Sequence, residues 1–204
     1  MAWTEEELNA YNIVIDEKEF LEEMISGVDY IHDADPDSEG DVEDLARGLL
    51  KHLGFDKSSR LLRTGRCIPL GTSSKVQIPI CIINRKTGSI LLVQEIKRQH
   101  NPIDPEPQVI AEAIATFQYN KHTNSSVIPC IIMVGTFPRF YLVPVTKELS
   151  ECVATGQRPR NTTRVLKHTP KVSKKNMKSV DSRRKILQCY ESFKKFVDEL
   201  EELI

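Results

Sequence analysis

The stretch Ile90-Leu-Leu-Val-Gln-Glu-Ile-Lys97 is apolar on both faces up to Gln94 and becomes polar only at its carboxyl end. A strand with this pattern is typical of the centre of a sheet that is covered by helices on both sides. Residues two apart on a strand point to the same face, so Glu95 and Lys97 present a carboxylate and an ammonium group side by side. Sites in such sheets lie beyond the carboxyl ends of the strands, and we therefore expect a cleft at this end.

The residues around this strand alternate between helical and extended patterns. Apolar residues at helical spacing predict helices, by residue number, at 41–53, 108–120 and 181–203, with a short one near 17–26. Extended patterns bounded by turn residues predict further strands at 66–70, 76–84, 127–134 and 140–146, with 89–97 as the strand just described. The sequence therefore predicts an α/β (α+β) fold with a central mixed sheet flanked by helices and a C-terminal amphipathic helix.

The chain has 204 residues, which suits one domain, and its charge is unevenly distributed along that length. Residues 1–44 hold sixteen acids and one base, whereas residues 157–185 hold eleven bases and one acid. We divide the domain into an acidic segment (1–40), a core (41–146), a basic exposed loop (156–180) and a final helix (181–203). The basic loop predicts non-specific, salt-dependent binding of nucleic acid. Its candidate phosphate-binding residues are Arg158, Arg160, Arg164, Lys167, Lys171, Lys174 and Lys175.

Cysteine usage and hydropathy bear on the compartment. The five cysteines are odd in number and widely spaced, so we expect all of them to be reduced. No apolar run approaches the roughly 18 residues that a membrane-spanning helix needs. We therefore expect an intracellular protein, cytoplasmic or nuclear, with no membrane partner; the oligomeric state is left open.

The order of helix 41–53, three strands ending in Glu95-Ile-Lys97, and helix 108–120 resembles the core of the PD-(D/E)xK, restriction endonuclease-like superfamily. Segments such as Gly40-Asp-Val-Glu-Asp-Leu and Gly135-Thr-Phe-Pro-Arg-Phe-Tyr also resemble a functionally uncharacterised group of fungal proteins. The superfamily resemblance implies a nuclease that depends on Mg²⁺ or Mn²⁺. It implies Glu43 and Glu95 as metal ligands and Lys97 as the residue that orients the attacking water. It also implies a polar residue on the next helix, at Gln108 or Gln118.

One expected ligand is missing from this pattern. The superfamily carries an acid on the strand before Glu-x-Lys, but residues 76–84 contain no Asp or Glu, and Pro79 stands about where the Asp is expected. Asp104 and Glu106, in the loop after Lys97, are candidates to replace it, or ordinary solvated turn residues.

Two functional classes therefore remain open, beside the third possibility that the basic loop is merely solvated and nucleic acid is irrelevant. The first is a metal-dependent phosphodiesterase or nuclease acting on DNA or RNA. The second is a catalytically inactive nuclease-like fold that serves as a nucleic-acid-binding or protein-interaction module, with Glu95 and Lys97 as an ordinary ion pair. Arg63 and Arg66, near the first strand, are further candidates for phosphate contact, or surface arginines with no specific role. We expect the first helix to cross the carboxyl end of the sheet and to bring Glu43 within reach of Glu95 and Lys97.

Overall fold

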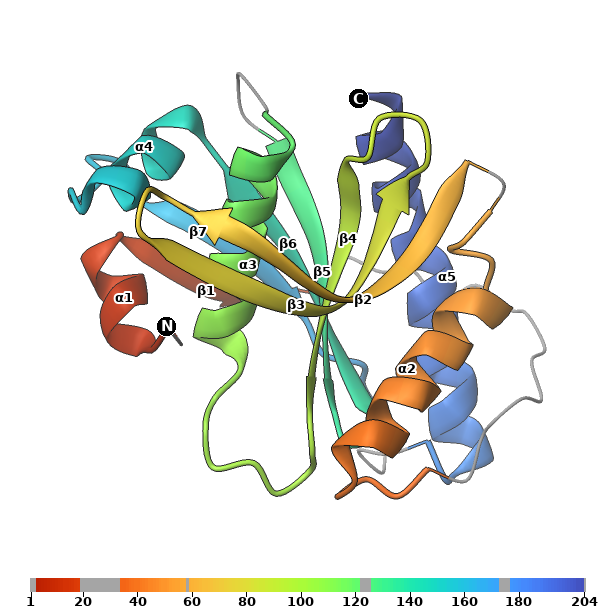
Figure 1. Ribbon diagram of the computed structural model, residues 1–204. Helices are drawn as coiled ribbons and strands as arrows, with labels where there is room; N and C mark the ends of the chain where they lie inside the picture. The colour runs from red at the N-terminus through yellow and green to blue at the C-terminus, as the bar shows by residue number, and fades with distance from the viewer. Residues whose placement is uncertain (1–2, 19–33, 58, 122–125, 173–176, 204) are drawn as a thin grey trace.

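The computed structural model describes residues 3–18, 34–57, 59–121, 126–172 and 177–203. Within them, the chain forms one mixed sheet of seven strands with helices on both faces (Figure 1). The strands are β1 (Ile13–Glu17), β2 (Arg60–Leu70), β3 (Ser74–Asn84), β4 (Ile90–Lys97), β5 (Ser126–Val134), β6 (Phe137–Val145) and β7 (Thr163–His168). The helices are α1 (Glu5–Ala10), α2 (Glu39–His52), α3 (Glu106–Tyr119), α4 (Lys147–Thr155) and α5 (Val180–Glu202). The prediction of a mixed sheet flanked by helices is thus confirmed.

The strands follow the spatial order β1-β7-β6-β5-β4-β3-β2. The β4–β5 and β1–β7 pairs are parallel, and the other neighbours are antiparallel. Parallel neighbours need a crossover connection, and α3 supplies it between β4 and β5. This crossover places the start of α3 close to the carboxyl end of β4.

Strand β4 lies in the interior because helices cover it from both sides. Figure 1 shows α3 on one face of the sheet, with α2 and α5 on the other. The residues of β4 from Ile90 to Ile96 are all buried, which accounts for the apolar sequence on both faces. The polar residues Gln94 and Glu95 are therefore also removed from solvent, at 0% and 2% exposure.

A buried arginine fastens α5 to the edge of the sheet. Arg60, at the start of β2, is 2% exposed and donates from Nε and Nη2 to Glu201 at 2.8 and 2.6 Å. Its Nη2 also donates to Asp198 at 2.6 Å. The cost of desolvating the guanidinium is offset by these charge-assisted bonds, so the last turns of α5 are held against β2.

The prediction of an exposed loop at 156–180 was wrong for residues 163–168. These residues form β7, which pairs with β1 on one side and β6 on the other. Strand β1 and helices α1 and α4 were not predicted at all. Of the helix predicted near 17–26, only Glu17, which ends β1, and Lys18 belong to the described residues.

The five cysteines are free, as the sequence predicts. None of the described helices is both long and apolar enough to span a bilayer.

Candidate functional site

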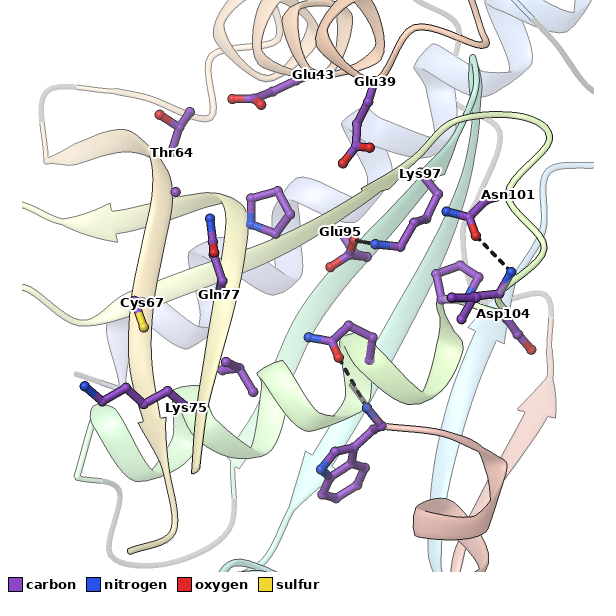
Figure 2. A pocket seen from close by; sticks show the side chains of 17 residues that line it. Glu39, Glu43, Thr64, Cys67, Lys75, Gln77, Glu95, Lys97, Asn101 and Asp104 are labelled. Atoms are coloured by element: carbon purple, nitrogen blue, oxygen red, sulfur yellow. Dashed lines mark hydrogen bonds and ion pairs between the residues drawn. The ribbon is translucent and has the colours of Figure 1, made fainter. Parts of the chain in front are cut away.

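A pocket of about 750 Å³ opens at the carboxyl end of β4. Its walls come from the first turns of α2, the start of α3 and the paired strands β2 and β3. The pocket brings together the four residues that the sequence analysis assigned to catalysis or metal binding: Glu43, Glu95, Lys97 and Gln108. Figure 2 shows Glu95 and Lys97 on β4 facing the pocket, with Glu43 on α2 across from them.

Glu95 and Lys97 form an ion pair at the bottom of the pocket. The Lys97 Nζ lies 2.7 Å from Glu95 Oε1, as the spacing of two residues on one strand predicts. The Glu95 side chain is 2% exposed, whereas that of Lys97 is 24% exposed. The ammonium group is thus the part of the pair that an entering ligand can reach.

A second carboxyl group, which the sequence analysis missed, lies against Glu95. Glu112, on α3, is fully buried. Burial raises its pKa well above the usual range, and the charge of Glu95 and a hydrogen bond with Glu95 raise it further. The amide of Gln108, one turn earlier on α3, donates to Glu112 at 3.0 Å. The upward shift of the pKa of Glu112 favours its protonated form, which can donate a hydrogen bond to Glu95.

Gln108 connects this buried pair to the N-terminal segment. Its side-chain oxygen accepts a bond of 3.4 Å from the backbone N–H of Trp3, while its nitrogen donates to Glu112. Trp3 is itself buried and lines the pocket. The amide is thus oriented by partners on both sides, which fixes the geometry of α3 against β4.

The carboxylates that line the pocket come from different elements. They are Glu39 and Glu43 of α2, Glu95 of β4 and Asp104 of the following loop. Figure 2 shows Glu39 directing its carboxylate into the pocket toward Lys97, whereas that of Glu43 points toward Thr64. Glu39 lies two residues before the predicted start of its helix, so the sequence analysis did not consider it.

The donor set limits what metal the pocket could hold. No three His, Cys, Asp or Glu side chains of the described residues are grouped closely enough to cage an ion. Pro79 lines the pocket where the superfamily pattern expects an acid. Mg²⁺ commonly uses one or two carboxylates, with water and substrate phosphate completing its shell. Glu95 with one acid of α2 fits such a weakly held ion, but not a cation bound by protein ligands alone.

Glu106, the other candidate for a replacement ligand, has a different role. Its carboxylate accepts a hydrogen bond of 2.8 Å from the Tyr141 hydroxyl and forms an ion pair of 2.7 Å with the Lys167 ammonium group. It does not line the pocket, which leaves Asp104 as the acid that the loop contributes.

The predicted nucleic-acid-binding bases are partly neutralised. On β7, Arg164 pairs with Asp16 at 3.3 Å, and Lys167 pairs with Glu17 at 3.5 Å as well as with Glu106. Parallel pairing with β1 thus brings acids of the N-terminal segment onto bases of the predicted basic loop. Arg158, Arg160 and Lys171 are exposed, and Lys174 and Lys175 lie outside the described residues.

No known family model and no curated protein sequence matches this chain. Its function must therefore be argued from the pocket itself.

Proposed function

We propose that this chain is a metal-dependent nuclease that hydrolyses phosphodiester bonds of DNA or RNA in the pocket at the end of β4. The observation that carries the proposal is the placement of Glu95 and Lys97 beside an acidic residue of α2 and Gln108 of α3 in that one pocket. The resemblance to the PD-(D/E)xK superfamily assigns Glu95, Lys97 and Gln108 to this site and Glu43 as the acid of α2, whereas Glu39 is added here because its carboxylate is directed toward Lys97. We take the sheet from β2 to β5, with α2 and α3, as the restriction endonuclease-like core.

Each residue has a role that follows from its position. Lys97, the more exposed member of the ion pair, positions the attacking water and offsets the negative charge that develops on the phosphate. Glu95 orients that ammonium group. Glu112 is buried, and the upward shift of its pKa favours a protonated carboxyl that supports Glu95, while Gln108 donates to Glu112.

The metal adds one contribution. Mg²⁺ or Mn²⁺, held by Glu95 and either Glu39 or Glu43, would act as a Lewis acid on the phosphate oxygens. Because two carboxylates hold such an ion only weakly, cleavage is expected to require millimolar metal and bound substrate.

Pro79 favours the second candidate function. With a proline in place of the expected acid, the same pocket suits a nuclease-like module that binds nucleic acid and no longer cleaves it. In that case Glu95 and Lys97 serve only as a buried ion pair that stabilises the end of β4.

A cleavage assay separates these functions. Single- and double-stranded DNA and RNA are incubated with the full chain in Mn²⁺, in Mg²⁺ and in EDTA. We expect metal-dependent products from the wild type, and a loss on the order of a hundredfold or more for Glu95→Gln and for Lys97→Met. Glu199→Gln, at an exposed position of α5, is purified in the same way and should cleave like the wild type.

The Pro79→Asp variant adds the missing carboxylate. If the wild type and this variant both fail to cleave in any metal, the chain is not a nuclease. If only Pro79→Asp cleaves, the natural protein is a degenerate nuclease and the binding function replaces the proposal. Equal activity of the wild type, Glu95→Gln and Lys97→Met would point to a contaminating enzyme and would also refute the assignment.

A further inference from the structure

A second hollow, of about 400 Å³, borders the pocket on the far side of Thr64. It lies between the later turns of α2 and the first half of β2, and Thr64 lines both cavities. Three of its side chains are basic: Arg47 and Lys51 of α2 and Arg63 of β2. We name the surface made by these three bases and Thr64 the α2–β2 groove. Among the described residues, the only acid that lines it is Asp56.

The bases of the α2–β2 groove are largely available to a ligand. Lys51 and Arg63 are exposed and form no ion pair within the described part of the chain. Arg47 bonds Asp44 at 3.2 Å through Nη1, and its side chain is 38% exposed. Arg66, by contrast, is occupied, because it bonds the Tyr119 hydroxyl and lies over that ring.

The groove continues the pocket in a straight line along α2. Glu43, Arg47 and Lys51 follow each other at intervals of four residues, which is roughly 6 Å of helix rise per step. In Figure 2 the Glu43 carboxylate points toward Thr64, the residue at which the pocket meets the groove. The acidic end of this face therefore lies at the candidate cleavage site, and the basic end lies just beyond it.

We propose that the α2–β2 groove binds the phosphodiester backbone of one nucleic-acid strand, next to the phosphate that lies at Glu95 and Lys97. This inference rests on the proposed function and names its substrate as single-stranded. Glu95 is 2% exposed, so the phosphate has to descend into the pocket while its neighbours follow the groove. A flexible single strand bends in this way at little cost, whereas bending a stiff duplex costs deformation energy.

The chemistry of the groove predicts recognition without sequence preference. Within the described part of the chain its lining contains no aromatic side chain for base stacking, and most of its charged groups are cations that match phosphate oxygens. Binding is therefore expected to depend on salt, with a slope of about −0.7 in log affinity against log salt for each phosphate contact on a single strand.

Fluorescence anisotropy with a labelled oligo(dT) of about 20 nucleotides, in EDTA, tests binding without cleavage. The full chain is compared with Lys51→Glu/Arg63→Glu and with the control variant Lys147→Glu/Lys195→Glu, which changes the net charge equally at exposed positions of α4 and α5 that do not line the pocket or the groove. We expect the groove variant to lose about tenfold or more in affinity and its salt slope to fall by about 1.4, the share of two phosphates. The control variant should change by less than about threefold, and a labelled duplex should bind the wild type more weakly than the single strand. Thermal denaturation of each variant confirms that it is folded.

The same variants in the cleavage assay separate failure of this inference from failure of the proposed function. Equal losses in both double variants, or a larger loss in the control variant, would overturn the groove. Tighter binding of the duplex would overturn the choice of a single strand. If the wild type cleaves and Glu95→Gln does not, but Lys51→Glu/Arg63→Glu binds the strand as tightly as the wild type, the nuclease function stands and the groove is rejected. A wild type that neither binds nor cleaves would reject both.

Discussion

Replacing the buried acid Glu112 with glutamine should make the protein more stable at neutral pH. The folded-state pKa of Glu112 is raised well above 4.5, first by burial and then by Glu95, so the folded protein keeps a proton that the unfolded chain loses. Between those two pKa values the folded state binds more protons, and the free energy of unfolding falls as pH rises. The fall is about 1.4 kcal/mol for each pH unit in that window. The amide of the introduced glutamine can donate to Glu95 as the neutral carboxyl does, and it does not titrate.

Urea denaturation of the wild type and Glu112→Gln, in EDTA at steps of about one unit from roughly pH 4.5 to 8, measures this effect. We expect similar stabilities at the acid end of this range and a difference that widens in favour of the variant as pH rises. Glu199→Gln, at an exposed position, should follow the wild type throughout. Wild-type and Glu112→Gln curves that run parallel over the whole range would show that Glu112 is not a buried neutral acid.

Two further predictions concern the framework of the site. Arg60→Ala removes the buried guanidinium from two partly exposed carboxylates of α5 and should lower the free energy of unfolding in urea by about 2–3 kcal/mol. Lys57→Ala breaks only a 3.8 Å surface pair with Asp198 and should cost under about 0.5 kcal/mol. Equal effects of the two changes would contradict the buried role of Arg60. Gly71 has a φ of +63°, and a Cβ added there would lie 3.1 Å from the backbone of α4, so Gly71→Ala should lower the free energy of unfolding by about 2 kcal/mol. Gly88 has a φ of +76° but open space around it, so Gly88→Ala should cost about 1 kcal/mol. A thermal scan that ranks Gly88→Ala as the less stable variant would refute this.

The central part of the fold was predictable because its sequence pattern is local. The apolar run of β4 and the helical spacing of α2 and α3 each reflect burial against neighbouring layers. Strands β1 and β7, which lie together at one side of the sheet, were not predictable in this way. Strand β7 contains Arg164 and Lys167, which pair with acids of β1 and α3 that are far away in sequence.

The same distinction applies to the candidate site. Glu95 and Lys97 could be chosen from the sequence because a polar pair ends an apolar strand. Glu112 could not, because the apolar residues on either side of it mark a buried helix face, and only the packing of α3 on β4 shows which carboxyl it meets. The one signal in the sequence is a lone acid within such an apolar run, four residues after Gln108.

The buried acids argue that the pocket serves more than stability. A helix face in contact with a sheet is most stable when it is apolar, and replacing buried ionic groups with well-packed apolar residues is often neutral or stabilising. Yet α3 places Glu112 directly against Glu95, so that one carboxyl has to remain protonated while the other is held by Lys97. Departures of this kind from the most stable packing are expected at functional sites, where a rigid polar group is needed next to a ligand. The network also ends at a cation that solvent can reach, so its effect is to hold the Lys97 ammonium in place at the bottom of an acid-lined pocket.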